Sequence, residues 1–70
     1  MSERVLGNRL RDARTRLNLT QAELALKAEV SRKTINTVEN GVFIPSTLLA
    51  LVLARNLKMS VEELFYLVEN

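Results

Sequence analysis

Apolar residues near the start of the chain recur at the spacing of one helix face. These residues follow one another at intervals of four, three and four positions: Leu6, Leu10, Ala13 and Leu17. This spacing matches a helix with about 3.6 residues per turn. The first turn is weak, because the glycine and asparagine at positions 7 and 8 disfavour a helix interior. The pattern predicts a first helix that buries this stripe.

A second helical pattern begins at Thr20. Glu23 follows three residues later, which is the spacing of a capping box. In that motif the side chain of each residue bonds the backbone N–H of the other. The helix that starts here is expected to bury Leu24, Ala25 and Ala28.

A third helix is expected over residues 32–40. Ser31 precedes it as a favoured N-cap residue, and Gly41 follows it, where a left-handed residue normally closes a helix. Ile35 and Val38 are spaced to form a buried underside. The other positions carry hydroxyl, amide or charged groups, which leaves a polar outer face.

Two further helices are expected over about residues 46–68. Pro45 makes the segment FIPST an extended connection, because the residue before a proline disfavours the helical conformation. Ser46 or Thr47 then caps a helix that runs to about residue 57. Ser60 caps another, with a glutamate at position 63 that completes a second capping box.

The fold class predicted from these patterns is all-α. No alternating pattern is long enough to indicate a strand. We expect one domain, residues 1–70, with five short helices around a single core. A domain of this size buries only about 60% of the surface of its unfolded chain, so it needs an efficient core or a partner.

Composition excludes most catalytic chemistry. The chain has neither cysteine nor histidine, which rules out disulfides, thiolate zinc sites, cysteine nucleophiles and histidine-based triads. The acidic residues are scattered, and no pair is spaced for carboxylate catalysis. We expect no enzyme, no cofactor and no metal.

The N-terminal segment MSERVLGNRLR lacks the apolar core of a signal peptide. The longest apolar run, LLALVLA, is far shorter than the roughly 20 residues of a membrane helix. We therefore expect a cytoplasmic protein with no membrane contact.

Charge is uneven along the chain: residues 1–40 carry eight basic and five acidic residues, against two basic and three acidic residues in residues 41–70. This asymmetry favours an oriented contact with a polyanion.

The second and third predicted helices are joined by only a few residues, from Ala28 to Ser31. Such a short connection forces a sharp crossing, which is the arrangement of a helix-turn-helix. A second helix with a polar outer face fits the major groove of B-DNA, which is about 12 Å wide. The motif is expected over about residues 20–40.

Residues 19–41, LTQAELALKAEVSRKTINTVENG, resemble the helix-turn-helix of the phage repressor and Cro-type (Xre-like) family of DNA-binding regulators. The resemblance continues through PS at 45–46 and MSVEELF at 59–65, so it covers nearly the whole chain. It implies a lambda-repressor-like fold, and the length is similar to that of small stand-alone members. The positions that match are Gln21, Leu24, Ala25, Val30, Ser31, Ile35, Glu39, Asn40, Gly41 and Pro45.

Because the apolar positions of the third helix point inward, four polar side chains are expected to reach base edges: Arg32, Lys33, Asn36 and Thr37. Arginine and lysine donate to guanine O6 and N7, and asparagine pairs with adenine. Thr34 lies nearer the edge and is a weaker candidate. Ser31 is expected to cap the helix and could contact a phosphate as well.

The resemblance implies phosphate contacts by Gln21 and Asn40. Gln21 opens the second helix, where the family uses glutamine on a phosphate or a nearby base, and free N–H groups with the helix dipole favour a phosphate. A C-terminal cap is the alternative role of Asn40. The family also pairs an arginine on the first helix with the glutamate before Asn-Gly. We therefore expect Arg14 to bind Glu39 as a structural pair.

The chain departs from the family pattern at three places. Glu29 stands where the tight turn usually has glycine, at a cost of about 1 kcal/mol for the left-handed backbone, and Lys58 replaces another common glycine. The connection after Gly41 reads Val-Phe-Ile instead of basic or amide residues. Fewer phosphate contacts predict weaker binding and a shallower salt dependence.

The expected fourth helix and the C-terminus carry more apolar residues than five helices easily cover. Scattered exposed apolar residues are the ordinary explanation. The alternative is a two-fold dimer interface that contains Leu48, Val52, Phe65, Tyr66 and Val68.

A dimer would place two reading helices about 34 Å apart, in successive major grooves of a palindromic site. We expect a sequence-specific transcriptional regulator, with repression the commoner outcome in the family and activation also represented. One alternative is an antitoxin, whose fourth or fifth helix masks a toxin partner while its helix-turn-helix represses their promoter. A domain that binds only protein is disfavoured by the donors on one face.

Overall fold

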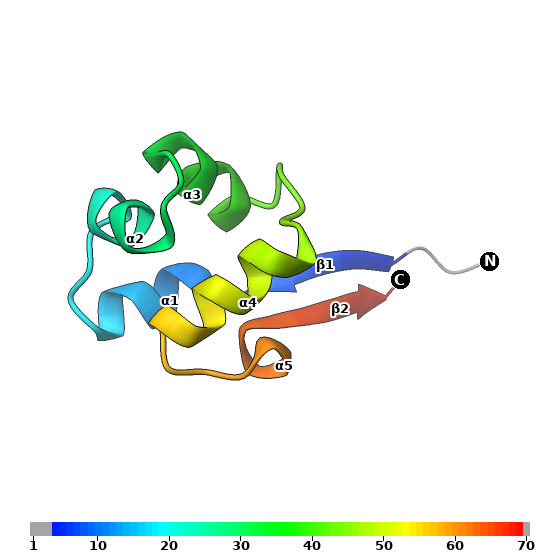
Figure 1. The fold of residues 1–70 in the computed structure, drawn as a ribbon. Coiled ribbons are helices and arrows are strands. Elements are labelled where there is room, and N and C mark those ends of the chain that lie inside the picture. The colour runs from blue at the N-terminus through cyan, green and yellow to red at the C-terminus, as the bar shows by residue number, and fades with distance from the viewer. Residues whose placement is uncertain (1–3, 70) are drawn as a thin grey trace.

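The computed structural model describes residues 4–69, which form five helices and a two-stranded antiparallel sheet (Figure 1). The elements in chain order are β1 (Arg4–Asn8), α1 (Leu10–Arg16), α2 (Gln21–Ala28), α3 (Arg32–Glu39), α4 (Thr47–Asn56), α5 (Val61–Leu64) and β2 (Phe65–Glu69). The strands run side by side away from the helices (Figure 1). The molecule therefore extends 39 Å along one axis and 21 and 20 Å along the others.

The core is built from the apolar faces of the helices. Every helix contributes to the most deeply buried side chains, which are Leu10, Leu24, Ile35, Val38, Leu53 and Leu64. Burial of one such side chain contributes about 1.5–3 kcal/mol relative to leaving it exposed. No helix within residues 4–69 is long and apolar enough to cross a membrane.

Side-chain caps begin four of the helices. Thr20 and Ser60 each form a complete capping box with the glutamate three residues later, as the sequence predicts. Ser31 Oγ accepts from the Thr34 N–H at 3.1 Å. Ser46, rather than Thr47, caps α4. These caps satisfy N–H groups that have no partner within the helix, and each is typically worth about 1 kcal/mol.

The prediction that the fold is all-α is wrong at both ends of the described chain. Residues 4–8 form β1 instead of the first turn of a helix, and α1 begins only at Leu10. The last helix ends at Leu64 rather than near residue 68, and β2 follows. The two strands pair antiparallel, from Arg4 opposite Glu69 to Asn8 opposite Phe65.

The sheet forms because segments at opposite ends of the chain meet. Gly7 lies opposite Tyr66, and a Cβ atom at Gly7 would be only 2.4 Å from Cε2 of that ring. The ring therefore occupies the space that a side chain at position 7 would need. The Arg9 guanidinium lies over the same ring, with its Cζ atom 4.3 Å from the Tyr66 ring centroid. None of these contacts is encoded in a local pattern.

Left-handed backbone closes the turns between helices. Glu29 and Lys58, which stand at family glycine positions, have φ angles of 58° and 59°. Gly41 has φ 73° after α3, as a C-terminal glycine should, and Asn18 has φ 58°. The expected tight turn between α2 and α3 is therefore present without glycine.

Candidate nucleic-acid interface

Helix α3 has one buried and one exposed face. Ile35 and Val38 are fully buried against the core. Arg32, Lys33 and Asn36 are exposed on the opposite face. Ser31 fixes the start of the helix through its cap, so the positions of these polar side chains follow from the packing of the apolar ones.

The two cations of α3 are free. Among the residues that the structure describes, the side chains of Arg32 and Lys33 form neither a hydrogen bond nor an ion pair. Both line an open polar hollow together with Asn36 and with Gln21 from α2. The structure thus brings together four of the predicted DNA-binding residues, from both helices of the motif. Uncompensated positive charge beside amide groups suits a surface that binds a polyanion.

The three hydroxyl residues of α3 are engaged locally. Ser31 Oγ accepts from the Thr34 N–H, and the Ser31 and Thr34 hydroxyl oxygens are 2.9 Å apart. Thr37 Oγ1 donates to the carbonyl oxygens of Lys33 and Thr34 at 3.0 and 2.9 Å. Because its only O–H is used, Thr37 offers a base edge an acceptor oxygen and a methyl group, and no donor.

Asn40 lies at the C-terminal end of α3. Its backbone N–H donates to the Asn36 carbonyl, and the next residue, Gly41, donates to the Val38 carbonyl, so Asn40 is the C-cap residue. Its side-chain Nδ2 donates to Asn36 Oδ1 at 3.3 Å. Its Oδ1 accepts from Arg11 Nη2, also at 3.3 Å. The side chain is exposed, so capping by the backbone does not prevent a contact with DNA by the amide.

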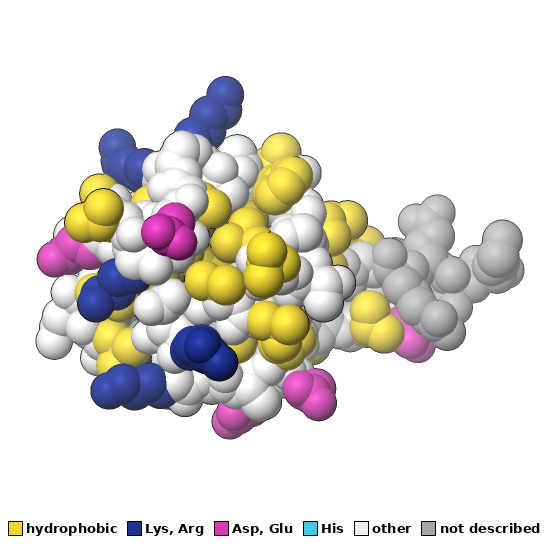
Figure 2. Space-filling view, in the orientation of Figure 1, with side chains coloured by type: hydrophobic (Ala, Val, Ile, Leu, Met, Phe, Trp, Pro, Cys, Tyr) yellow, Lys and Arg dark blue, Asp and Glu magenta, His cyan; other side chains and the backbone are white. Residues whose placement is uncertain are grey.

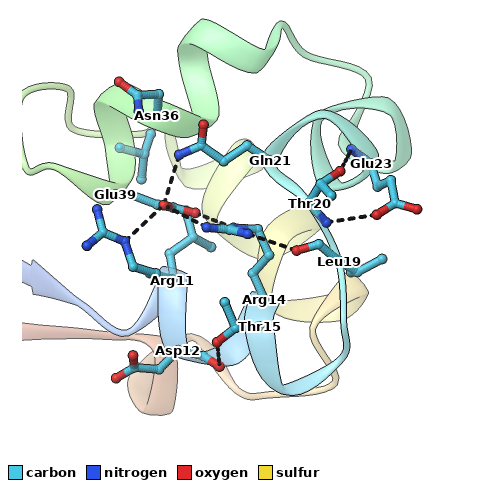
Figure 3. A network of polar contacts seen from close by, with 12 residues as sticks. Arg11, Asp12, Arg14, Thr15, Leu19, Thr20, Gln21, Glu23, Asn36 and Glu39 are labelled. Carbon is cyan, nitrogen blue, oxygen red and sulfur yellow. Dashed lines mark hydrogen bonds and ion pairs between the residues drawn. The ribbon is translucent and has the colours of Figure 1, made fainter.

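Glu39 is the centre of a polar cluster that joins α1, α2 and α3 (Figure 3). Arg14 donates through Nε to Glu39 Oε2 at 2.7 Å and through Nη2 to Oε1 at 3.3 Å. Gln21 Nε2 donates to Glu39 Oε1 at 3.1 Å. The remaining Arg14 nitrogen, Nη1, donates to the Leu19 carbonyl at 2.8 Å. The structure therefore brings the expected pair into contact and adds Gln21 to it.

Two opposing effects set the pKa of Glu39. Its side chain is 0% exposed, and burial alone would raise the pKa of this carboxyl. Hydrogen bonds from Arg14 and Gln21, the charge of Arg14 and a contact with Arg11 outweigh that effect and lower the pKa below the ordinary glutamate value. Glu39 is therefore a carboxylate at neutral pH. The neighbouring arginines offset its charge, so it does not cancel the positive charge of Arg32 and Lys33 on the same helix.

Two residues of this region were not predicted from the sequence. Arg11 on α1 contacts both Glu39 and Asn40, and only its place one turn before Arg14 hinted at this. Asn8 accepts from the Leu10 N–H through Oδ1 and donates through Nδ2 to the Val38 carbonyl at 2.9 Å. Asn8 thus connects β1, α1 and the end of α3, where the sequence indicated only a weakened helix.

The residues predicted for a dimer interface lie on α4 and β2 and differ in exposure. Phe65 is only 7% exposed and belongs to the core, so it offers little area to a partner. Tyr66 and Val68 are exposed, but alternate residues of a strand point to opposite faces, and so both lie on the face away from Phe65. Leu48 is 72% exposed on α4, while Val52 is half-buried.

A further apolar surface lies on α4 and the connection before it. We define the apolar face as the exposed side chains of Phe43, Ile44, Leu48 and Leu51. Adjoining hollows connect these residues through shared lining residues, among them Pro45 and Phe65. Figure 2 shows hydrophobic side chains gathered in the middle of this view, over α4 and toward the sheet.

Comparisons with known proteins agree with this geometry. The profile of the helix-turn-helix family matches residues 10–64. The chain is 34% identical to the HTH-type transcriptional regulator YgzD of Bacillus subtilis over 64 residues, which cover 91% of this chain and 97% of YgzD. It is 42% identical to a regulator from Archaeoglobus fulgidus over 60 residues, or 86% of each chain. Both relatives are named as uncharacterized HTH-type transcriptional regulators.

A solved structure has the same arrangement. The restriction-modification controller protein C.AhdI from Aeromonas hydrophila matches with a TM-score of 0.74 and 34% sequence identity, over 79% of this chain and 83% of that chain. The residues that match the family profile include both helices of the motif and all the helices that build the core. The chain belongs to the Xre-like helix-turn-helix family of DNA-binding transcriptional regulators, which are not enzymes.

Proposed function

We propose that this protein is a dimeric repressor that recognises a specific palindromic sequence in double-stranded DNA. One observation carries the proposal: Gln21, Arg32, Lys33 and Asn36 surround one polar hollow, and the two cations have no partner among the described residues. The family relationship supports a role in transcription for this surface.

In this proposal α3 lies in the major groove. Arg32 and Lys33 donate to guanine, and Asn36 to adenine or another acceptor, with about 1–3 kcal/mol of discrimination for a good bidentate contact. Thr37 adds its methyl group and an acceptor oxygen. Gln21, at the start of α2, and Asn40, at the end of α3, bind backbone phosphates. Ser31 and Thr34 add contacts to DNA only where their hydroxyls remain accessible. Phosphate contacts set the position of α3, and base contacts set the sequence.

The apolar face supports a second copy of the chain as the dimer partner. Phe43, Ile44, Leu48 and Leu51 are uncharged, so two identical patches meet across a two-fold axis without repulsion between like charges. The face follows directly on the C-terminal end of α3 along the chain. A two-fold axis here gives two symmetric reading helices, which is the requirement of a palindromic site.

Repression follows from occupancy. A dimer bound over a promoter excludes polymerase by its volume and needs no further domain or ligand. The antitoxin alternative has no specific support, because the relatives reported above are named as transcriptional regulators and a controller protein. C.AhdI is the controller of a restriction-modification system by name, and we take from it only the regulator class.

The experiment that tests this function is selection of bound sequences from a random duplex pool, at physiological salt with excess competitor DNA. Enrichment of an inverted repeat with half-sites about 10 base pairs apart is expected for a dimer of this size. Failure of folded protein to enrich any sequence would contradict the proposal. Repression is then read from transcription of a reporter whose promoter overlaps the selected site.

Two lysines provide a matched pair of variants. Lys33→Gln removes a donor from α3 and should relax the preference at one position of each half-site. Lys27→Gln removes the same charge from the last turn of α2, where the lysine is exposed but outside the hollow. The selected sequence should therefore be unchanged in Lys27→Gln. Equal effects of both substitutions would show that α3 does not read bases.

A further inference from the structure

Arg11 is a second arginine beside a carboxylate that needs only one. Its Nε lies 3.5 Å from Glu39 Oε1, yet its side chain is 62% exposed, against 12% for that of Arg14. Arg14 alone already bonds both oxygens of Glu39, and Gln21 adds a further donor. The Glu39 carboxylate is therefore satisfied without Arg11, and the cluster of two arginines and one glutamate carries a net positive charge.

Arg11 also controls the orientation of the Asn40 amide. A guanidinium has five N–H donors and no acceptor, so it donates only to the oxygen end of a neighbouring amide. Arg11 Nη2 donates to Asn40 Oδ1 at 3.3 Å, and Asn40 Nδ2 then donates to Asn36 Oδ1 at 3.3 Å. This chain of hydrogen bonds leaves one N–H of Asn40 and both N–H groups of Asn36 free to donate.

These groups lie around an open polar hollow at the end of α3. The hollow is lined by Asn8, Arg9, Arg11, Asp12, Glu39 and Asn40. Asp12 contributes a negative charge to this hollow, but Arg9 and Arg11 line it as well. The charge of Glu39 is offset by its ion pair with Arg14. Figure 3 shows Arg11 approaching Glu39 from α1, with the two terminal nitrogens of its guanidinium directed away from the cluster. The local charge thus favours an anion.

We infer that Arg11 and the Asn40 amide form a binding site for a backbone phosphate of the DNA, on the strand that passes the C-terminal end of α3. This inference rests on the proposed DNA binding and extends it to a residue of α1 outside the helix-turn-helix. Arg11 supplies charge and donors, and it turns the N–H end of Asn40 toward the same anion. Because a phosphate is common to all sequences, Arg11 adds affinity and does not add specificity.

The test is the salt dependence of operator binding by the full chain and its Arg11→Gln variant. Each phosphate contact contributes about 0.9 to the slope of log affinity against log salt concentration. Arg11→Gln should therefore lower the slope by about one per protomer. The affinity advantage of the unmodified protein should grow about threefold per site between 200 and 50 mM salt. The selected DNA sequence and the melting temperature should stay the same.

Arg16→Gln is the matched control, because Arg16 is an exposed arginine on the same helix. It lies near Glu63 of α5, and its charge contributes to lowering the pKa of Glu63, away from α3. The salt slope should not change in this variant. Arg11→Lys keeps the charge and should retain most of the slope, although it loses the geometry of the guanidinium.

A slope for Arg11→Gln equal to that of the unmodified protein, or equal losses in Arg11→Gln and Arg16→Gln, would overturn the inference. These outcomes leave the proposed function intact as long as the unmodified protein still binds its operator. Absence of specific binding by the unmodified protein would instead contradict the proposed function itself.

Discussion

At the scale of single residues, one buried carboxylate organises the side of the molecule that is proposed to bind DNA. Glu39 belongs to the helix that carries Arg32 and Lys33, and its charge would repel DNA if it were exposed. Arg14 and Gln21 surround it instead, from α1 and α2. A buried pair of this kind is not strongly stabilising by itself, but removal of one partner leaves an uncompensated charge.

Arg14→Ala should therefore lower the free energy of unfolding by about 3 kcal/mol, before any effect on DNA contacts. Chemical denaturation followed by circular dichroism measures this loss. Arg16→Ala, at an exposed position of the same helix, should change stability by less than about 0.5 kcal/mol. An Arg14→Ala protein with unchanged stability and lost operator binding would make Arg14 a phosphate ligand instead.

Acid should destabilise the fold partly through Glu39. Because the pKa of Glu39 is lowered in the folded state, the unfolded chain binds more protons at low pH. The stabilising contribution is complete above the unfolded pKa of about 4.3 and is lost as pH falls through the lower folded pKa. The capping glutamates Glu23 and Glu63, whose pKa values are lowered by backbone and hydroxyl hydrogen bonds, act in the same direction.

Glu39→Gln should accordingly be less stable than the unmodified protein at pH 7 and show a flatter loss of stability between pH 5 and pH 3. Some slope should persist because of Glu23 and Glu63. Denaturation midpoints at a series of pH values give both quantities. Parallel pH profiles for the two proteins would show that Glu39 does not contribute to acid unfolding.

At the scale of elements, the two-stranded sheet depends on a small residue opposite a large one. Gly7 leaves room for the Tyr66 ring, and the ring in turn supports the Arg9 guanidinium. Two-stranded sheets are marginal in water without such support. The end of the sheet is anchored in the core by Phe65.

Gly7→Val should displace the Tyr66 ring and destabilise the fold by about 1–2 kcal/mol, as overpacking typically does. In a Tyr66→Ala background the clash is absent, and valine suits a strand better than glycine. The same substitution should then be neutral or stabilising. The double-mutant cycle isolates the contact between positions 7 and 66. Equal costs of Gly7→Val in both backgrounds would contradict this account of the glycine.

At the scale of the whole molecule, the charged and apolar surfaces are separated. Free cations lie on α3, and the apolar face lies over α4 and the connection before it (Figure 2). One surface is proposed to meet DNA and the other a second copy of the chain. The separation allows both contacts at once, which a dimer on an operator requires.

Leu48→Gln should weaken the dimer, because it places a polar group in the apolar face at a position that is 72% exposed. Sedimentation equilibrium should show a dissociation constant about tenfold or more higher, and binding to the palindrome should weaken more than binding to a half-site. Leu26→Gln is the control, since Leu26 is 81% exposed on α2 and outside the apolar face. A monomeric unmodified protein, or equal effects of both variants, would reject this interface.

Sequence alone determined the features of this protein that depend on near neighbours. Caps at Thr20 and Ser60, the buried stripe of α3 and the turn at Glu29 follow from residues within about one helical turn of each other, and the structure has all of them. The outward position of the polar side chains of α3 follows as well, because burial of Ile35 and Val38 leaves the other face to polar groups.

Only the tertiary structure decided what depends on distant segments. Residues 4–8 and 65–69 are too short to show an alternating pattern, and they become strands only because packing of the helices brings the two ends of the chain together. The same packing buries Phe65, sends Tyr66 and Val68 to the other face of the sheet, and carries Arg11 to Asn40. Local periodicity reports which face of an element is buried, but it does not report which distant residue will cover it.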